Sequence, residues 1–419
     1  MKQYLCIDLK SFYASVECVE RGLDPETTDL VVADPTRTDK TICLAVSPSL
    51  KAKGVKNRCR VFQIPKNLKY ITAPPRMQKY IDYSAEIYGI YLNFFSKDDI
   101  HVYSIDEVFI DATNYLKLYG ISIKELAQKI LLEIYSAFKL RAACGIGTNL
   151  FLAKVALDIL AKHSKDHIAI LNEETFKERL WDHTPLTDFW RIGVNTAAKL
   201  NKRGIYTMGD IANADENLLY KLFGIDAELI IDHAYGREPT TINDIKKYKS
   251  KTNCISSGQV LSRDYNFEEA LIIVKEMADI LTIELKAKKL LTPSITLHIG
   301  YSKETEIPYT HGSISLKYPT NTDTEIISHI EKLFNTIALI NNPIRRINVT
   351  FNNTISDESG RQIYLFENVY ETDKKSRLQD AVINIKHRYG KNSILKGMNL
   401  LPAATTRERN NQIGGHKSG

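Results

Sequence analysis

No stretch of this 419-residue chain approaches the run of about 18 apolar residues that a membrane-spanning helix needs. The first residues, MKQYLCIDLKSFYASVE, carry acids within their apolar stretch, so we expect no secretory leader. Glycine (20 residues) and proline (13 residues) are too few for a collagen-like or low-complexity chain, and 43% of the residues are hydrophobic. The chain is too long for one compact core, so we expect several globular domains.

Cysteine is sparse and scattered. The six cysteines show neither a CxxC spacing nor a nearby pair of histidines, and they are Cys6, Cys18, Cys43, Cys59, Cys144 and Cys254. This pattern argues against structural zinc and against a scaffold held together by disulfides. We expect reduced thiols that lie mostly in the core, and a cytoplasmic location.

Positive charge is in small excess overall but is unevenly distributed along the chain. The net charge is +6, whereas residues 374–419 contain ten Lys or Arg and two acids, so that the remaining chain sums to −2. A second basic stretch, residues 51–69, contains seven Lys or Arg and no acid. Each run alone is typical of a solvated surface, but two runs in a nearly neutral chain favour a phosphate-rich ligand.

Strand-like and helix-like segments alternate over about the first 170 residues, which indicates an α/β or α+β layer fold. Ser122 and Glu125 form a capping box before an amphipathic helix, and residues 149–162 predict a largely buried helix. Residues 191–205 indicate either a plain helical packing unit or a helix-hairpin-helix, whose turn offers backbone N–H groups to a DNA phosphate. Residues 239–252 are polar and basic and indicate a linker.

The last third of the chain predicts a small β-α-β-β-α-β domain. The expected strands and helices, in order, cover residues 254–260, 271–285, 295–301, 313–318, 323–338 and 347–351. From about residue 352 the sequence becomes polar and basic and ends in GGHKSG. There we expect one short helix at about 376–388 within a mostly mobile tail.

Three acidic residues interrupt apolar segments. Asp8 closes an apolar strand, and Asp106 and Glu107 break the apolar pattern of HVYSIDEVFID (101–111). Adjacent strand residues point to opposite faces, so Asp106 and Glu107 can serve one site only at a turn or bulge. Three carboxylates suit Mg²⁺, and two such ions can clamp an in-line phosphoryl displacement. The alternative is that these acids only cap a turn and a helix.

The segments CIDLKSFYASVE (6–17) and SIDEVFID (104–111) together resemble the two signature motifs of the Y-family translesion DNA polymerases. Within that family they are most similar to the bacterial UmuC-like branch of the UvrX type (ImpB/MucB/SamB-like), over about residues 1–351. The resemblance implies an α+β multidomain fold with the shape of a right hand. The implied parts are a palm (1–20 and 73–168), small fingers (21–72), a helical thumb with a helix-hairpin-helix (169–240), a βαββαβ little finger (250–352) and a basic tail with a clamp-binding peptide (353–419).

The resemblance also implies the chemistry of the acids. Asp8, Asp106 and Glu107, with the backbone carbonyl of Leu9, would bind two Mg²⁺ ions, for which Mn²⁺ is a substitute. The same carboxylates would be the catalytic residues of a nucleotidyl transfer, in which one ion activates the primer 3′-hydroxyl and the other holds the triphosphate.

Contacts to the nucleotide and to DNA likewise follow from the resemblance. Tyr13 corresponds to a steric gate that excludes the ribose 2′-hydroxyl, and Phe12 would stack behind the sugar; outside this motif both would be ordinary core aromatics. The implied triphosphate contacts are Ser47, Lys51 and Lys162, and the implied DNA contacts in the thumb are Arg191, Gly193 and Lys199.

The sequence departs from the family pattern at three places. Pro48 stands where an archaeal relative carries a tyrosine. One extra residue separates Lys154 from Lys162, and Arg191 stands in place of the first glycine of the common G-I-G turn. These are the places where the triphosphate and thumb contacts can differ from those of the family.

Residues 362–366, QIYLF, match the Q-x-x-L-F pattern by which bacterial polymerases dock on the β sliding clamp. Gln362, Leu365 and Phe366 would be the contacts, although so short a pattern also arises by chance. The expected partners are therefore primer-template DNA, deoxynucleoside triphosphates and the clamp. A UmuD-like subunit and a recombinase filament stay open as further partners, and we expect no membrane partner.

The function that the resemblance implies is error-prone DNA synthesis opposite damaged template, as part of DNA repair and the SOS response. One alternative is a catalytically weak recruitment factor derived from such a polymerase, but Asp8, Asp106 and Glu107 are all present. A second alternative is a two-metal nuclease or nucleotide cyclase on a similar palm. A cyclase needs no thumb, DNA-binding hairpin or clamp peptide, and candidates for all three are present.

Overall fold

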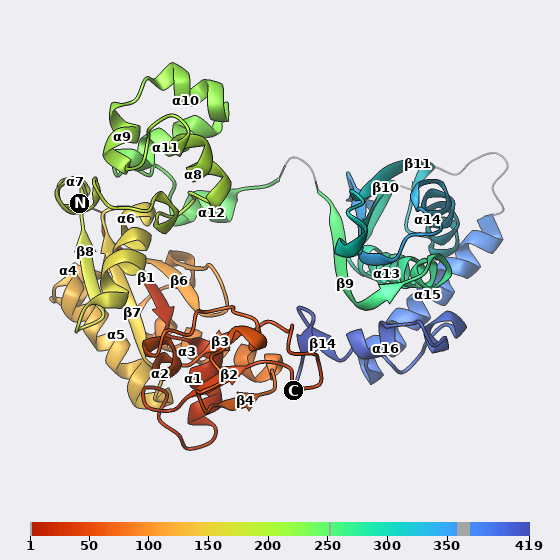
Figure 1. The fold of residues 1–419 in the computed structure, drawn as a ribbon, viewed down its shortest axis with the longest axis horizontal. Helices are drawn as coiled ribbons and strands as arrows, with labels where there is room; N and C mark the ends of the chain where they lie inside the picture. Colours follow the sequence, from red (N-terminus) through yellow and green to blue (C-terminus); the bar gives the residue numbers. More distant parts are fainter. Residues whose placement is uncertain (1, 251–252, 358–368) are drawn as a thin grey trace. The chain divides into compact units, whose positions relative to one another are not determined.

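The computed structural model describes residues 2–250, 253–357 and 369–419 (Figure 1). The chain divides into two compact units. One unit comprises Met1–Tyr248 together with His416–Gly419, and the other comprises Lys249–Gly415. Both units combine helices with a β-sheet, which confirms the expected α+β class.

A five-stranded sheet with the order β5-β6-β1-β7-β8 forms the centre of the first unit. Its strands are β1 (Tyr4–Leu9), β5 (Ile100–Val102), β6 (Glu107–Asp111), β7 (Ala142–Gly147) and β8 (Ile168–Leu171). β1 lies antiparallel to both β6 and β7, and it places Asp8 opposite Glu107 on one side and Ala143 on the other. The residues of β7 are all buried, which is why this strand reads as a continuous small and apolar run.

Helices and short helical turns lie between the strands of this sheet along the chain. They are α3 (Met77–Phe94), α4 (Tyr115–Tyr119), α5 (Ile123–Phe138) and α6 (Leu150–Val155), with the 3₁₀ turns η2 (Lys97–Asp99) and η4 (Ala161–His163) and the π-helical segment η3 (Ala156–Leu160). The predicted capping box of α5 is confirmed, because the Ser122 hydroxyl accepts from the Glu125 N–H at 3.2 Å and the Glu125 carboxylate accepts from the Ser122 N–H at 2.8 Å. Every residue of α6 is buried, as the sequence predicts.

Two glycines of β7 allow α6 and η3 to approach the sheet closely. A Cβ atom at Gly145 would lie 2.0 Å from the carbonyl oxygen of Ala153 and 2.3 Å from the backbone nitrogen of Leu157. A Cβ atom at Gly147 would lie 2.2 Å from the Ala153 nitrogen. Since backbone atoms cannot move aside as a side chain can, these positions require glycine.

We expect Gly145→Ala to destabilise the first unit by about 3 kcal/mol or more, because overpacking against backbone cannot be relieved by a rotamer change. The matched control is Gly89→Ala in α3, where a Cβ would meet nothing within 4 Å. There the same substitution should be neutral or stabilise by about 0.5–1 kcal/mol, since alanine favours helix. Urea unfolding of both variants tests this, and equal midpoints would contradict the packing argument.

The predicted fingers contain a small sheet of their own with the order β3-β2-β4. The elements in and beside it are α1 (Phe12–Val19), β2 (Leu30–Val32), β3 (Ala45–Val46), α2 (Pro48–Ala52), η1 (Val61–Gln63) and β4 (Ile71–Ala73). β2 pairs antiparallel with β3 and parallel with β4. Its core is a compact cluster around Val31, Cys43, Val46 and Leu50, all of them buried.

The predicted thumb is helical, as expected. Its elements are α7 (Glu173–Leu180), η5 (Leu186–Asp188), α8 (Val194–Asn201), α9 (Met208–Asn213), α10 (Glu216–Phe223) and α11 (Asp226–Ala234). Phe176, Leu200, Met208 and Leu219 are among the residues of its buried core.

The segment predicted as a linker, residues 239–252, contains the boundary between the two units and has a helix in its middle part. Residues Ile242–Lys247 form the helix α12, which the Thr241 hydroxyl caps by accepting from the Asp244 N–H at 3.2 Å. Ile242 is buried in the same cluster as Tyr4 of β1. Ile242, together with the partly buried Ile245 packed against the same cluster, therefore fixes this segment to the first unit.

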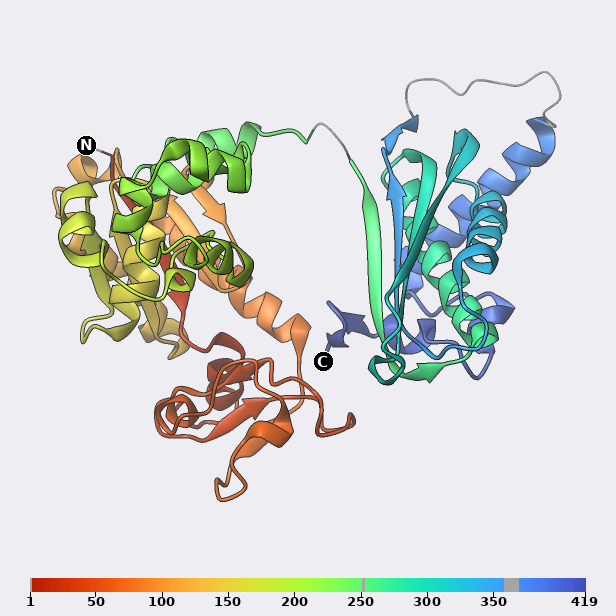
Figure 2. The ribbon, with the colours of Figure 1, turned by 45° about the horizontal axis from the view of Figure 1, so that its top comes forward.

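The second unit shows the predicted β-α-β-β-α-β order. Its main elements are β9 (Ile255–Tyr265), α13 (Phe267–Ala287), β10 (Leu290–Tyr301), β11 (Thr310–Thr320), α14 (Asp323–Ile337) and β12 (Ile344–Asn352), with η6 (Lys303–Thr305) and β13 (Ile355–Ser356). The strands form an antiparallel sheet in the order β11-β10-β12-β9, and Figure 2 shows α13 and α14 on one side of it. The alternating apolar residues that predict these strands face the two helices.

The expectation of a mostly mobile tail is wrong for much of the segment after residue 390. The tail contains α15 (Val369–Tyr389), η8 (Gly397–Leu400), α16 (Thr406–Arg409), β14 (Gln412–Ile413) and β15 (His416–Lys417), and α15 is longer than the predicted helix. Glu276 of α13 is 1% exposed, and its carboxylate accepts from the Asn399 amide at 2.8 Å and from the Thr405 and Thr406 N–H groups at 2.8 and 3.2 Å. A buried acceptor thus holds a polar segment in place.

Candidate active site

The structure brings the three predicted acids together where β1 ends and β6 begins. Asp8 lies opposite Glu107 in the β1–β6 register. Asp106 lies in the turn before β6, where its carbonyl accepts from the Leu9 N–H at 2.9 Å and its carboxylate accepts from the Ser104 hydroxyl at 2.6 Å. Asp106 thus lies outside strand β6, in a turn of the kind that the sequence requires if Asp106 and Glu107 are to serve one site.

Lys154 of the buried helix α6 holds Glu107. Its ammonium nitrogen lies 2.6 Å from Glu107 Oε1 and 3.0 Å from Asp158 Oδ2. The Cys6 thiol donates to the same Glu107 oxygen at 3.2 Å. Glu107 is 6% exposed, so these partners compensate a charge that would otherwise be costly to bury.

Lys162 plays the same part for Asp8. The Lys162 ammonium lies 3.2 Å from Asp8 Oδ2 and 2.8 Å from Asp158 Oδ1. Burial raises the pKa of Asp8 to about 6, with repulsion from Asp106 and Glu107 acting in the same direction and Lys162 against it. Burial and two neighbouring acids thus favour the protonated form of Asp8. Additional positive charge next to this carboxylate would stabilise its charged form.

The extra residue between Lys154 and Lys162 has a structural counterpart. The chain between these lysines passes through the π-helical segment Ala156–Leu160, and a π turn takes up one residue more than an α turn does. Both lysines still contact Asp158. The π-helical segment therefore accommodates the extra residue, and Lys162 still points toward Asp8.

The donor set suits a hard divalent cation, since it consists of carboxylate oxygens. In the part of the chain that the structure describes, however, no three Asp, Glu, His or Cys side chains converge tightly enough to hold an ion. Lysine ammonium groups contact Asp8 and Glu107 instead. Burial, together with repulsion from Asp106 and Glu107, raises the pKa of Asp8, so a cation bound beside it would favour the charged carboxylate.

Tyr13 lies at the start of α1 beside this acidic cluster. Its ring stacks on the ring of Tyr80, with 4.4 Å between the centroids and an angle of 16° between the planes. Phe12 is 2% exposed, and its ring centre lies 5.7 Å from that of Tyr13. Burial and the nearby Asp106 raise the pKa of Tyr13, so its hydroxyl stays protonated at neutral pH.

Sequence reasoning missed a buried ionic network behind Tyr13. The Glu17 side chain is fully buried and accepts from Arg76 Nε at 2.8 Å, from Arg76 Nη2 at 2.9 Å and from the Tyr80 hydroxyl at 2.8 Å, and it also pairs with Arg21. Tyr80 thus joins Glu17 to Tyr13. The only sequence signal was an acid inside the apolar pattern of α1, which would ordinarily face solvent.

The two predicted contacts in the fingers lie in different surroundings. Ser47 is fully buried, and its hydroxyl accepts from the N–H groups of Leu30 at 3.1 Å and Leu50 at 3.4 Å, so it caps α2 and the geometry does not support a nucleotide contact. Desolvation by the surrounding protein, together with repulsion from Lys162 and Lys10, lowers the pKa of Lys51, while attraction by Asp8 acts in the opposite direction. Lys51 therefore belongs to a group of cations around Asp8.

Of the predicted DNA contacts of the thumb, Arg191 and Gly193 precede α8, whereas Lys199 lies in its last turn. Gly193 is the N-cap residue of α8. Arg191 adopts a φ of 72°, which a glycine would adopt without strain, and its guanidinium lies 5.0 Å from the ring centre of Trp190. Lys199 lies on α8 with its ammonium 5.5 Å from the Phe223 ring.

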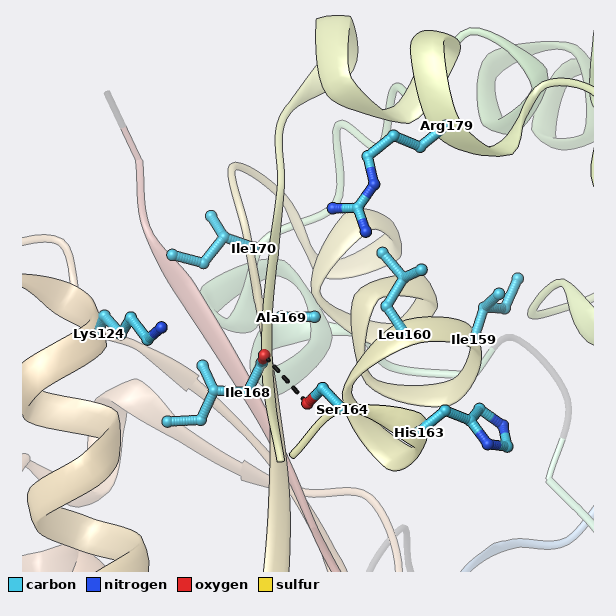
Figure 3. Close-up of a pocket in the computed structure, with 9 residues that line it drawn as sticks. All are labelled: Lys124, Ile159, Leu160, His163, Ser164, Ile168, Ala169, Ile170 and Arg179. Carbon is cyan, nitrogen blue, oxygen red and sulfur yellow. Dashed lines mark hydrogen bonds between the residues drawn. The ribbon is translucent and has the colours of Figure 1, made fainter. Parts of the chain in front are cut away.

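The predicted clamp-binding residues Gln362, Leu365 and Phe366 lie outside the described residues. A pocket of about 470 Å³ lies against β8 rather than at the acids (Figure 3). It is lined by Lys124, Ile159, Leu160, His163, Ser164, Ile168, Ala169, Ile170 and Arg179. None of the predicted site residues lines it, so the chemistry predicted from the sequence is not located there.

Comparison with known proteins decides the family. Residues 7–158 match the impB/mucB/samB family, and residues 253–365 match the impB/mucB/samB family C-terminal domain. The chain is 33% identical over 419 residues to UvrX of Bacillus subtilis (strain 168), a protein named for UV-damage repair, with 100% of this chain and 98% of that protein covered. The chain belongs to the impB/mucB/samB family of Y-family, UmuC-like DNA polymerases. It is thus classed among the DNA-directed DNA polymerases.

Further matches support the same family and fold. DNA polymerase IV 2 of the same organism is 30% identical over 420 residues, covering 99% of this chain and 98% of that protein. The solved structure of the Y-family DNA polymerase chimera Dbh-Dpo4(243-245)-Dbh matches with a TM-score of 0.67 and 22% identity, over 84% of this chain and 99% of that chain, which shows a shared fold. Among the described helices, none is long and apolar enough to cross a membrane.

Proposed function

We propose that this family member is an error-prone translesion polymerase, which adds deoxynucleotides to a primer 3′ end opposite damaged template. The observation that carries the proposal is the grouping of Asp8, Asp106 and Glu107 at adjacent strand ends, with Tyr13 beside them. Acids arranged in this way serve phosphoryl transfer, and an aromatic ring next to them can select the sugar of the nucleotide.

Each group of this site has a proposed task in nucleotidyl transfer. Two Mg²⁺ ions, when bound, supply positive charge to the primer 3′-hydroxyl and to the triphosphate. Asp8, Asp106, Glu107 and the Leu9 backbone carbonyl would offer the oxygen ligands for them. Lys154 orients Glu107 at 2.6 Å. Y-family DNA polymerases generally depend on a divalent metal, which agrees with this donor set.

Two lysines are proposed to receive the triphosphate. Lys162 and Lys51 surround Asp8, and an arriving polyphosphate would compete with Asp8 for their ammonium groups. Asp8, freed from Lys162, would then be available as an oxygen ligand for a bound cation. The basic stretch 51–69, which begins at Lys51, would add long-range attraction for the same anion.

The alternative of a catalytically weak recruitment factor has less support, because the buried Lys154–Glu107 pair keeps an intact and oriented acid at the site. The proposed partners are primer-template DNA, deoxynucleoside triphosphates and, through Gln362, Leu365 and Phe366, the β sliding clamp. A cytoplasmic role in DNA repair and the SOS response is part of the same proposal.

The test is primer extension on paired templates that are identical except for one abasic site or one thymine dimer. The proposal predicts insertion opposite the lesion and extension beyond it, with frequent misinsertion on the undamaged template. Asp106→Asn is the matched inactive control. Arrest at every lesion together with accurate copying of undamaged DNA would overturn the translesion assignment.

The proposed gate makes a separate prediction. Tyr13→Ala should raise the incorporation of ribonucleotides relative to deoxynucleotides by about 10- to 200-fold, since one steric feature of a pocket is worth about 1–3 kcal/mol. The control Tyr13→Phe keeps the ring stacked on Tyr80 and should keep the selectivity. Single-nucleotide kinetics with both sugars measures it, and unchanged selectivity in Tyr13→Ala would contradict the gate.

A further inference from the structure

Two cysteines of the fingers face each other across a short antiparallel pairing. Ile42 and Arg60 form an antiparallel bridge, and the Cys43 N–H donates to the Cys59 carbonyl at 2.8 Å. Cys43 and Cys59 are therefore directly opposite residues of adjoining backbone segments. The Cys59 N–H donates to the Lys56 carbonyl, so the two cysteines share a single backbone hydrogen bond. Directly opposite residues of an antiparallel pair have Cα atoms about 4.5–5.5 Å apart, which lies within the span of about 4.4–6.8 Å that a disulfide bridges.

The side chains of these cysteines also meet. The Cys43 thiol hydrogen bonds with the Cys59 side chain, and both cysteines are free. Cys43 is fully buried, whereas Cys59 is partly exposed to solvent. The remaining cysteines are the buried Cys6, Cys18 and Cys144 and the exposed Cys254. The pair thus combines an accessible sulfur with a buried sulfur directly behind it.

We propose that Cys43 and Cys59 form a reversible intramolecular disulfide when the protein meets a peroxide, and that this bond restrains the nucleotide-facing part of the fingers. The proposal rests on the paired geometry and the difference in exposure of the two sulfurs. Disulfides in reducing compartments are usually transient and redox-sensing, so a reversible bond fits a cytoplasmic protein better than a permanent one.

The reaction balances with one peroxide molecule. The Cys59 sulfur attacks a peroxide oxygen, the O–O bond breaks, and the leaving hydroxide takes up a proton to form water, which leaves Cys59 as a sulfenic acid. The Cys43 sulfur then attacks the Cys59 sulfur, the S–O bond breaks, and the released hydroxide forms a second water with the Cys43 proton. Burial and the Cys59 neighbour raise the pKa of the Cys43 thiol to about 12, which makes Cys59 the sulfur that reacts first.

The bond would enclose the segment that carries the cations of the fingers. The closed loop runs from residue 43 to residue 59 and contains β3, α2 and Lys51. Arg58, next to Cys59, lies close enough to Tyr13 to act on its pKa. A covalent tie at the base of this loop would therefore limit its movement around an incoming nucleotide. Only this last consequence rests on the proposed function.

Mass mapping tests the site without reference to polymerase activity. Full-length protein is treated with hydrogen peroxide, free thiols are alkylated, and peptides are sequenced. The expected result is a Cys43–Cys59 linked peptide, a loss of two hydrogen atoms, and full reversal by dithiothreitol. The linkage should vanish in Cys59→Ser and persist in Cys254→Ser. If Cys59→Ser does not fold, the wild-type peptide map alone decides.

Two outcomes would overturn the inference. One is full alkylation of Cys43 and Cys59 after a treatment that oxidises the exposed Cys254. The other is a Cys59 that stops at the sulfenic or sulfinic acid, or pairs with another molecule, while Cys43 stays free. Single-nucleotide addition by the oxidised protein, measured before and after treatment with dithiothreitol, then tests the restraint on the fingers. Addition should fall on oxidation and recover on reduction. Absence of activity in both states would instead count against the proposed function.

Discussion

Replacing Asp106 with asparagine should lower nucleotide addition by about 10³-fold or more, since removing one preorganised charge from a transition-state site costs about this much. Asp106 is the cleanest of the three acids for this test. Its carboxylate accepts from the Ser104 hydroxyl at 2.6 Å and lies in a turn, where an asparagine side chain can accept the same hydrogen bond. Single-turnover primer extension measures the effect.

The control for this variant is its stability. Asp106→Asn should unfold at the wild-type urea midpoint, because no ammonium group is left unpaired by the change. Glu107→Gln is the contrasting variant, since it deprives the buried Lys154 of its partner at 2.6 Å and should lower the stability as well. Wild-type activity in Asp106→Asn would mean that this acid does not take part in the reaction.

Replacing Arg76 with alanine should destabilise the first unit by about 3 kcal/mol, the lower end of the effect of breaking a buried ion pair. Arg76 holds the fully buried Glu17 carboxylate through two hydrogen bonds of 2.8 and 2.9 Å, and Arg21 and the Tyr80 hydroxyl compensate only part of the loss. Because the Tyr80 ring supports Tyr13, selection against ribonucleotides should weaken in the same variant.

Lys79→Ala is the matched control. Lys79 contacts the exposed side of Glu20 at 2.6 Å, so its loss should cost less than about 1 kcal/mol. Urea unfolding compares the two variants, and equal destabilisation would contradict the network.

The pH dependence of the Arg76 effect follows from Glu17. Burial alone would raise the pKa of Glu17, but hydrogen bonds from Arg76, Arg21 and Tyr80 lower it below its ordinary value. A depressed pKa contributes stability that is present at neutral pH and is lost as the pH falls through the folded-state pKa. The stability gap between wild type and Arg76→Ala should therefore shrink between about pH 7 and about pH 3.

Patterns of short range made much of this protein predictable. The β-α-β-β-α-β order of the second unit follows from alternating apolar residues in strands and a three-to-four residue repeat in helices. The turn at Asp106 follows from the requirement that two adjacent acids share a site. Even the extra residue before Lys162 was visible in the sequence, although only the structure shows that a π-helical segment absorbs it.

Long-range pairing of single polar residues could not be predicted. Glu17 and Arg76 are distant in sequence, and nothing local indicates that they meet behind Tyr13. Glu276 likewise orders the tail through Thr405 and Thr406, which a composition-based argument reads as mobile. Ser47 shows the reverse case: the motif suggested a ligand contact, whereas its position before Pro48 makes it a helix cap.

The most direct measurement is single-nucleotide primer extension with Mg²⁺ on four templates that differ only in the next base, with wild type beside the Asp106→Ala plus Glu107→Ala double variant. Template-dependent addition that a chelator and the double variant both abolish is the predicted result. Addition that ignores the template, or that survives loss of both acids in folded protein, would contradict a templated nucleotidyl transfer at this site.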